Sequence, residues 1–305
     1  MKALILVTGS DGLVGSRFVE LTERRNYLHL PTEIEFDITD FSEVRKIIGG
    51  YLFSAVINFA GFTDIEKAEE QRNDKSGDCW QVNFEGVKNL VEAIKSYKAR
   101  IHFIQISTDD VFSGDSEDPG PYSEYHQQET NLEKLTWYGY SKAQAEKYIL
   151  SELGGYATIL RINYPVRAKF SKKLDLLRKH LKLFDEGKLY PLFNDQHISI
   201  SFIDELSRVI DRIILGRNVG IFHAASCDCV NPYDLITYLV EKARGKTDQV
   251  KSTSIDEFLK TSGNPTFRYP KYGGLKVEQT DKELGFKFKS WREIVDQIVL
   301  QGIEY

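Results

Sequence analysis

Short apolar runs alternate along the chain with stretches whose apolar residues recur at helical spacing. The apolar runs predict β-strands at 3–7, 27–30, 54–61, 101–106, 156–162 and 220–225. The helical spacing predicts helices at 13–25, 40–48, 63–70, 77–98, 138–153, 171–187, 202–215, 231–244 and 291–302. Continuous apolar strands that alternate with helices are typical of a parallel sheet buried on both faces. The pattern therefore predicts an α/β fold with a doubly wound, Rossmann-type parallel sheet.

The turn after the first predicted strand contains three glycines, Gly9, Gly12 and Gly15. We expect Gly9 to adopt turn angles that other residues avoid, Gly12 to let a pyrophosphate approach the backbone, and Gly15 to let the helix pack closely on the strand. The helix N-terminus would then offer N–H groups to a phosphate. The spacing G-x-x-G-x-x-G also occurs in glycine-rich turns of other α/β proteins. Its position between the first strand and a helix favours a dinucleotide site.

The regular alternation loosens after residue 162, and a chain of 305 residues is long enough for a second lobe. We expect residues 1–162, rejoined by about 199–224, to form the dinucleotide-binding Rossmann domain. Residues 163–198 and 225–305 are expected to form a smaller C-terminal substrate-binding lobe.

Tyr138 and Lys142 lie four residues apart, on one face of a predicted helix. An ammonium group favours a neighbouring phenolate, so we expect the pKa of Tyr138 to lie below the usual ~10. Such pairs are also common on exposed helices, so the order of the motifs along the chain is needed to decide between an ordinary surface pair and an acid–base pair. A glycine loop comes first, then a strand ending at Ser107 and Thr108, and then Tyr-x-x-x-Lys. This order predicts an acid–base site at the strand ends.

Composition and charge argue against several function classes. The net charge of −5 argues against nucleic acid or an anionic membrane as a partner. No apolar run approaches the roughly 20 residues of a membrane helix, and no signal-peptide pattern opens the chain, so we expect a cytoplasmic protein. The three cysteines make no disulfide framework. A metal at Cys227, Cys229 and His223 would lack a second pair of ligands, so we predict no metal site.

Together these motifs resemble the extended short-chain dehydrogenases/reductases, and most of all the dTDP-4-dehydrorhamnose reductase family. The resemblance covers nearly the whole chain. Its clearest motifs are V-I-N-F-A-G-F-T at 56–63 with K-A-E at 67–69, V-N-F-E-G-V-K-N-L at 82–90, S-T-D-D-V-F at 107–112, and Y-G-Y-S-K at 138–142 with Glu146. Shorter matches follow in the family's order: D-Q at 195–196, F-I-D-E-L at 202–206, G-I-F-H at 220–223 and W-R-E at 291–293.

The resemblance implies an enzyme that uses NADPH or NADH to reduce a 4-keto group on a nucleotide-activated deoxysugar. In that case Tyr138 would protonate the growing alkoxide, Thr108 would hydrogen-bond the same oxygen, and Lys142 would hold the nicotinamide ribose. Besides Tyr138 and Lys142, the implied cofactor-binding residues are Gly9, Ser10, Asp11, Gly12, Leu13, Val14, Asp37, Ile38, Phe59, Ala60, Gly61, Thr63 and Asn83.

Other residues are expected at the substrate. Asp109 and Asp110 follow Thr108, and Asp110 stands where the family usually has Tyr. Asn163 opens N-Y-P, which replaces the family's T-S-W, so the substrate pocket is expected to differ from the usual one. Arg167 belongs to a basic stretch that either forms a solvated helix face or meets the substrate's diphosphate. The resemblance adds Gln196 and Arg268 as further candidates.

Two other functions stay open at this point. The pair Asp109-Asp110 approaches in charge the Asp-Glu pair of nucleotide-sugar 4,6-dehydratases, so a dehydratase or an epimerase of the same superfamily is one alternative. A regulatory subunit that binds a dinucleotide without turnover is the other. The expected partner is a nucleotide sugar, and the expected state is a monomer or a homodimer. The nucleotide, the sugar and the choice between NADH and NADPH stay open.

Overall fold

The computed structural model describes residues 3–31, 36–97, 100–245, 249–262 and 268–305. The chain divides into two compact units. The first contains residues 1–112, 127–161 and 207–222, and the second contains 113–126, 162–206 and 223–305. The segment 113–126 thus belongs to the second unit, which the pattern of apolar and polar residues did not predict.

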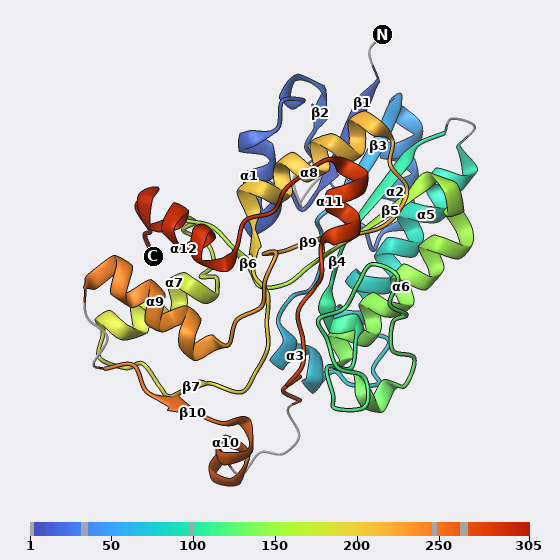
Figure 1. Ribbon diagram of the computed structural model, residues 1–305. Coiled ribbons are helices and arrows are strands. Elements are labelled where there is room, and N and C mark those ends of the chain that lie inside the picture. The colour runs from blue at the N-terminus through green and yellow to red at the C-terminus, as the bar shows by residue number, and fades with distance from the viewer. Residues whose placement is uncertain (1–2, 32–35, 98–99, 246–248, 263–267) are drawn as a thin grey trace. The chain divides into compact units, whose positions relative to one another are not determined.

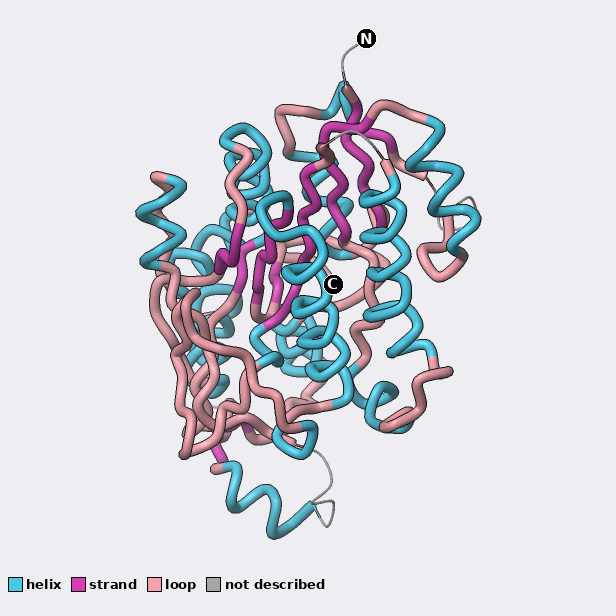
Figure 2. The backbone as a smooth tube through the Cα atoms, turned by 90° about the vertical axis from the view of Figure 1, so that its right-hand side faces the viewer, coloured by secondary structure: helices cyan, strands magenta, loops and turns pink. Residues whose placement is uncertain are grey.

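A six-stranded sheet, in the order β2-β1-β3-β4-β5-β9, is the framework of the first unit (Figures 1 and 2). Its strands are β1 (Leu4–Thr8), β2 (Leu28–His29), β3 (Phe53–Asn58), β4 (His102–Thr108), β5 (Ala157–Ile162) and β9 (Gly220–Ala224). β1 pairs in parallel with β2 on one side and β3 on the other, and β3 pairs in parallel with β4. The predicted Rossmann-type sheet is confirmed. Its strand order reverses between β1 and β3, where open α/β sheets bind ligands beyond the carboxyl ends of the strands.

Helices cover both faces of this sheet (Figure 1). On one face pack α2 (Phe41–Gly50), α5 (Gly86–Ser96) and α6 (Trp137–Leu153), and on the other α1 (Leu13–Leu21) and α8 (Ile203–Gly216). Val56, Leu90, Phe103 and Ile149 are fully buried in the first of these layers. Burial of each such side chain stabilises the fold by about 1.5–3 kcal/mol.

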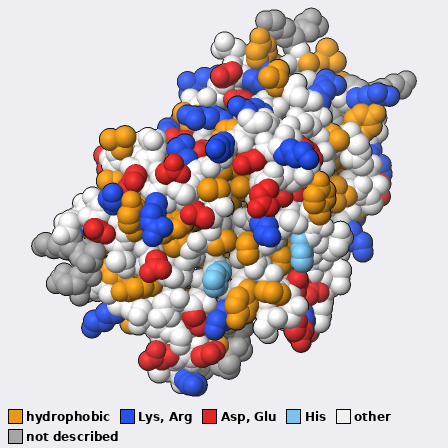
Figure 3. Space-filling view, viewed as in Figure 1, with side chains coloured by type: hydrophobic (Ala, Val, Ile, Leu, Met, Phe, Trp, Pro, Cys, Tyr) orange, Lys and Arg blue, Asp and Glu red, His pale blue; other side chains and the backbone are white. Residues whose placement is uncertain are grey.

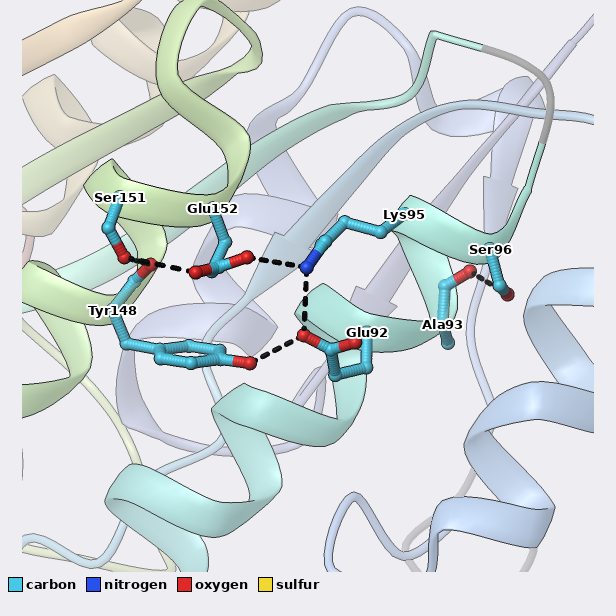
Figure 4. A network of polar contacts seen from close by, with 7 residues as sticks. All are labelled: Glu92, Ala93, Lys95, Ser96, Tyr148, Ser151 and Glu152. Atoms are coloured by element: carbon cyan, nitrogen blue, oxygen red, sulfur yellow. Dashed lines mark hydrogen bonds and ion pairs between the residues drawn. The ribbon is translucent and has the colours of Figure 1, made fainter.

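The outer side of the α5–α6 contact carries a network of charged and phenolic groups (Figure 4). Glu92 accepts hydrogen bonds from the Tyr148 hydroxyl at 2.5 Å and from Lys95 at 3.2 Å. Lys95 also reaches Glu152 at 2.5 Å. The side chains of Glu92, Lys95 and Glu152 are about one-third exposed, so solvent screens both ion pairs and their contribution to stability is small.

The second unit has its own core, formed where α7 (Leu176–Asp185), α9 (Pro232–Arg244) and α12 (Trp291–Leu300) pack together. Two short parallel pairs join β6 (Pro165–Val166) to β8 (Ser201–Phe202) and β7 (Leu192–Phe193) to β10 (Ser252–Thr253). The remaining α-helices of this unit are α10 (Ile255–Ser262) and α11 (Glu278–Leu284), and α3 (Ile65–Glu70) belongs to the first unit. On the face shown in Figure 3, Lys and Arg side chains are interspersed with Asp and Glu among the described residues.

Several predicted boundaries were wrong, each for a local reason. The helix expected at 77–98 is α4 (Asp78–Trp80), a π-helical turn over Gln81–Glu85, and then α5; its expected last residue lies outside the described residues. The helix expected at 40–48 is α2 (Phe41–Gly50), which also includes Gly49 and Gly50. The helix expected at 171–187 starts only at Leu176, because the Asp175 side chain caps it by accepting a hydrogen bond from the Arg178 N–H. The sequence pattern missed α10 and α11, which have seven or eight residues each.

Candidate active site

The glycine loop between β1 and α1 allows close backbone contacts. Gly9 has φ +59°, and a Cβ atom there would lie 2.7 Å from the backbone nitrogen of Ala60. A Cβ at Gly15 would lie 2.3 Å from the Gly9 carbonyl oxygen. Gly15 therefore packs on the loop itself, where we expected a contact with the strand. Gly12 is the N-cap of α1, and a Cβ there would have only the Gly9 oxygen, at 3.3 Å, within contact distance.

A pocket of about 420 Å³ lies at this loop, at the carboxyl ends of β1 and β3. Seven of the predicted cofactor residues line it: Gly9, Ser10, Asp11, Asp37, Ile38, Ala60 and Gly61. Five other residues line the pocket without having been predicted: Thr8, Pro31, Phe36, Phe62 and Val82. Thr8 ends β1 and Pro31 closely follows β2, a position that would have indicated them, whereas Val82 lies in the π-helical turn at Gln81–Glu85. A hollow of about 570 Å³ on the outer side of α2 is lined by no strand-end residue, so we do not assign the dinucleotide to it.

Apart from Tyr138 and Lys142, six predicted cofactor residues do not line the pocket: Gly12, Leu13, Val14, Phe59, Thr63 and Asn83. Phe59 instead packs against Phe18 of α1, with ring centroids 5.5 Å apart. Asn83 is fully buried in the π-helical turn. Its side chain accepts from the Phe62 N–H at 2.9 Å and donates to the Phe62 carbonyl at 3.0 Å. It therefore supports the pocket wall from behind.

Buried polar side chains join the ends of the three central strands. The Thr8 hydroxyl donates to the Asn58 side-chain oxygen, and the Asn58 amide donates to Gln105 at 2.8 Å. Thr8 also accepts a hydrogen bond from the Ala60 N–H at 3.3 Å. Since buried polar groups are costly unless paired, these contacts fix how the loops after β1 and β3 leave the sheet. No motif in the sequence predicted this role for Thr8, Asn58 and Gln105.

Helix α6 brings Tyr138 and Lys142 to this edge of the sheet. Its N-cap, Thr136, accepts a hydrogen bond from the Gly139 N–H at 3.0 Å. Tyr138 and Lys142 are 9% and 5% exposed. The Lys142 Nζ reaches the pocket wall, because a Cβ atom at Gly61 would lie only 3.0 Å from it. Lys142 of the predicted acid–base pair therefore lies at the wall of the predicted dinucleotide pocket.

The expected fall in the pKa of Tyr138 is wrong. Burial raises the pKa of the Tyr138 phenol above its usual value, and the Asp110 carboxylate raises it further, against an opposing hydrogen bond from Thr108. Burial also lowers the pKa of Lys142, to about 8, although Cys79 and Glu146 oppose this. Desolvation, which a sequence pattern does not report, outweighs the attraction between the two groups. Tyr138 is therefore held in its protonated, proton-donating form.

Thr108 ends β4, and a short 3-10 helix over Asp109–Val111 follows it. The Thr108 hydroxyl accepts a hydrogen bond from the Asp110 N–H at 3.1 Å and donates to the Asp110 carboxylate at 3.2 Å. A Cβ atom at Gly139 would lie 2.1 Å from the Asp110 carbonyl oxygen. Glycine at position 139 therefore lets α6 approach this turn and places Tyr138 beside Thr108.

A buried ion pair fixes α6 against the sheet. The Arg161 guanidinium on β5 donates to Glu146 of α6 at 2.6 Å, and both side chains are 1% exposed. Ser107 on β4 donates to the same carboxylate at 2.5 Å. In the sequence, Glu146 was recognised only as part of the motif around Tyr138, with no predicted role. Its contacts make it the anchor of the helix that carries Tyr138 and Lys142.

The remaining substrate candidates lie in the second unit. The Arg167 guanidinium lies 5.2 Å above the Phe170 ring, and its backbone N–H donates to Asp175. The Arg268 guanidinium donates to the Ser113 carbonyl, and the Gln196 amide donates to the Pro270 carbonyl at 2.9 Å. Asn163 follows β5; its carbonyl accepts a hydrogen bond from the Ser201 N–H at 2.8 Å, and its own N–H donates to the Ser201 hydroxyl at 2.9 Å. A substrate role for these four residues stays a prediction.

Two further features bear on the predicted partners. Among the described residues, no three His, Cys, Asp or Glu side chains come together as potential metal ligands. His223 is buried, and its Nδ1 bonds the Lys276 carbonyl at 2.9 Å, so it has a structural partner. In the described part of the chain, no helix combines the length and apolar character needed to cross a bilayer.

Comparison with known proteins finds dTDP-4-dehydrorhamnose reductases both among the relatives and among the solved structures. The chain is 26% identical over 305 residues to the dTDP-4-dehydrorhamnose reductase of Aggregatibacter actinomycetemcomitans, covering 97% of this chain and 98% of that protein. It is 31% identical over 227 residues to that of Streptomyces griseus, covering 72% and 70%. Among solved structures, a dTDP-4-dehydrorhamnose reductase from Bacillus anthracis in complex with NADP has a TM-score of 0.81, at 22% identity and with 98% and 99% covered.

The family assignment follows from a match along almost the full chain. The sequence model described as "RmlD substrate binding domain" matches residues 1–302. The strand order, the glycine loop and the Tyr138–Lys142 pair described above lie within this range. The chain therefore belongs to the RmlD family of dTDP-4-dehydrorhamnose reductase-like proteins.

Proposed function

We propose that this protein catalyses the NAD(P)H-dependent reduction of a 4-keto group on a nucleotide-activated deoxysugar. The observation that carries the proposal is the position of Lys142 Nζ at Gly61, which brings the acid–base helix to the dinucleotide pocket. The names of both curated relatives, dTDP-4-dehydrorhamnose reductase, support the same reaction class.

The pocket residues fit a dinucleotide. At Gly9 and Gly15 a side chain would collide with loop backbone, whereas at Gly12 the space beside the backbone is more open. A pyrophosphate could therefore approach the N-terminus of α1, whose N–H groups favour anions. Asp37, Ile38, Phe36 and Pro31 form the wall available to the adenosine end. When bound, the reduced nicotinamide supplies the hydride.

In the proposed reaction, the side chains at the strand ends handle the proton. A ketone that gains a hydride at carbon develops negative charge on its oxygen, and Tyr138 donates its phenolic proton to that oxygen. The products are the alcohol and a tyrosinate, which must regain a proton from solvent before the next turnover. Lys142, next to Gly61, would bind the ribose and stabilise this tyrosinate electrostatically. Asp109 and Asp110 would face the sugar.

A panel assay tests the proposal. Purified protein is incubated with dTDP-, UDP- and GDP-4-keto-6-deoxysugars and with either NADH or NADPH, and loss of the reduced nicotinamide is followed by absorbance. A reductase consumes one reduced nicotinamide for each alcohol formed. A 4,6-dehydratase would instead release water from a nucleotide-hexose with no net change in nicotinamide. A regulatory subunit would bind the dinucleotide and convert none of these substrates.

A further inference from the structure

Helix α6 begins one residue before Tyr138, and an acidic side chain from another helix contacts this beginning. Glu69 lies on α3, and one of its carboxylate oxygens accepts a hydrogen bond from the Trp137 N–H, the first of α6. The first N–H groups of a helix have no partner within the helix, so they need one from outside. A carboxylate is favoured at this end by the helix dipole. Glu69 therefore caps the turn that contains Tyr138.

Arg72 extends this contact to the chain just before α6. Its Nε donates to the other carboxylate oxygen of Glu69 at 2.9 Å. Its two terminal nitrogens donate to the carbonyls of Leu132, at 3.4 Å, and Leu135, at 2.6 Å. A guanidinium presents its donors in a fixed fork, so these bonds constrain one another. Together, Glu69 and Arg72 tie α3 to the segment before the helix and to the first residue of the helix.

Trp137 is fixed by its side chain as well as by its N–H. It is 1% exposed and stacks on Trp80, with ring centroids 5.3 Å apart, and on Tyr140, with centroids 5.7 Å apart. Tyr138 belongs to the same apolar cluster, against which Phe62 of the pocket wall also packs. A displacement of Trp137 would therefore also displace the phenol of the next residue.

The helix that carries Glu69 follows directly on the loop that contains Phe62. Its N-cap is Asp64, whose carboxylate accepts a hydrogen bond from the Lys67 N–H at 3.1 Å. Neither Glu69 nor Arg72 is among the described residues that line the dinucleotide pocket. We therefore expect Glu69 to act on the site through the position of α6 and not through a contact with the dinucleotide.

We propose that Glu69 is a positioning residue: together with Arg72 it holds the first turn of α6, and so keeps the Tyr138 phenol where it can protonate the substrate oxygen. This inference rests on the proposed function, because it takes Tyr138 as the proton donor. Glu146 anchors α6 about two turns further along, against β4 and β5, so it does not replace Glu69 at the first turn. Since proton transfer needs close approach, a small displacement of Tyr138 should lower the rate of the chemical step more than the affinity for the dinucleotide.

Amide hydrogen exchange, followed by NMR, tests whether Glu69 holds this turn. Glu69→Gln keeps the size of the side chain and removes its charge. The amides of residues 137–140 should then exchange roughly tenfold faster or more, whereas those of residues 149–153, in the last turns of α6, should change less than about twofold. Glu70→Gln, which alters the exposed next residue of α3, is the matched control and should change neither group. Equal acceleration along the whole of α6, or none at its first turn, would overturn the proposal.

Steady-state kinetics tests whether this turn matters for the chemistry. With a 4-keto sugar that the wild type reduces, Glu69→Gln should lower kcat by roughly 10–100-fold, as expected for a misplaced catalytic group. The KM for NAD(P)H should stay within about twofold, because the pocket itself is unchanged. Glu70→Gln should leave both constants unchanged. A kcat equal in the two variants, or a loss confined to KM, would contradict the positioning role.

A double-mutant cycle tests whether Arg72 acts together with Glu69. Arg72→Gln removes the same ion pair from its other side, and the double variant should lose no more than about threefold more kcat than Glu69→Gln alone. Losses that multiply would contradict the joint role. If Glu69→Gln does not fold, Arg72→Gln takes its place, and the same local increase in exchange at residues 137–140 is expected.

The two measurements separate this inference from the proposed function. A wild type that reduces no keto sugar would refute the proposed function, and hydrogen exchange would still decide whether Glu69 holds the turn of Tyr138. An active wild type whose kcat is unaffected by Glu69→Gln would refute the inference alone.

Discussion

At the scale of single residues, burial determines the chemistry of the site. The spacing of Tyr138 and Lys142 identified the pair, but it gave the wrong direction for the pKa of Tyr138. The direction of the pKa shift depends on the burial of Tyr138 and on the Asp110 carboxylate. The spacing of two residues in the sequence reports neither that burial nor the fold of the turn at 109–111. The roles of Thr8 and Asn58 could not be predicted for the same reason, because they depend on side-chain hydrogen bonds between neighbouring strands.

The most direct test at this scale removes the phenolic proton. Tyr138→Phe should lower turnover by about two to four orders of magnitude, the usual contribution of a general acid. Cofactor affinity, measured by nicotinamide fluorescence, should stay within twofold, because the hydroxyl alone is lost. Retention of wild-type turnover would mean that another group donates the proton.

Lys142 makes stability depend on pH in a predictable direction. Its pKa is about 8 in the folded protein and roughly 10.4 in the unfolded chain, so the unfolded state binds more protons between these values. The contribution of Lys142 to the free energy of unfolding therefore rises with pH across this window. At pH 7, Lys142→Met should be more stable than the wild type by up to about 3 kcal/mol. Denaturant titrations should show this difference shrinking by pH 10.5, whereas a constant difference would contradict the assignment.

At the scale of elements, the glycine loop and the Glu146–Arg161 ion pair that anchors α6 determine the geometry of the site. The sequence pattern identified the strands and major helices because their apolar periodicity is strong. It missed the π-helical turn at Gln81–Glu85, which places Asn83 behind Phe62, because a π turn has no apolar period of its own. It also missed α10 and α11, whose short length leaves little periodicity to detect.

The glycine loop allows a matched pair of substitutions. Gly12→Val adds a branched side chain where the pyrophosphate is expected, so the protein should fold and lose at least 100-fold in NAD(P)H affinity, which corresponds to about 2.7 kcal/mol. Gly49→Ala in α2 has no atom within 4 Å of the added carbon and should leave the affinity unchanged. Isothermal titration calorimetry measures both affinities. Wild-type binding by Gly12→Val would show that the dinucleotide lies elsewhere.

The anchor of α6 should be far more important for stability than the surface network beside it. Glu146→Gln leaves Arg161 buried without its charged partner and should lower the free energy of unfolding by about 3–5 kcal/mol. Glu92→Gln in the network of Figure 4 changes a partly exposed pair and should cost less than about 1 kcal/mol. Equal losses in urea unfolding would contradict the role assigned to Glu146.

At the scale of the whole molecule, the two units differ in how far the sequence predicts them. The first follows a regular alternation of strand and helix, so its topology and the edge that carries the site could be predicted. The second is built from two-residue strand pairs and short helices, and the positions of Asn163, Arg167, Gln196 and Arg268 depend on loop contacts such as the bond from Arg268 to Ser113. The residues that meet the sugar and its nucleotide therefore depend on loop contacts, which carry no periodic signal in the sequence.

The central claim is that a dinucleotide pocket and a proton-donating tyrosine act together in one ketone reduction. The most direct measurement mixes the wild-type protein with NADPH or NADH and dTDP-4-keto-6-deoxysugars, and follows reduced nicotinamide by absorbance and the sugar product by mass spectrometry. We predict that one reduced nicotinamide disappears for each sugar that gains two hydrogen atoms, and that Tyr138→Phe all but abolishes both changes. Loss of water from a nucleotide-hexose without net change in nicotinamide, or no conversion of any keto sugar in the panel, would contradict this account.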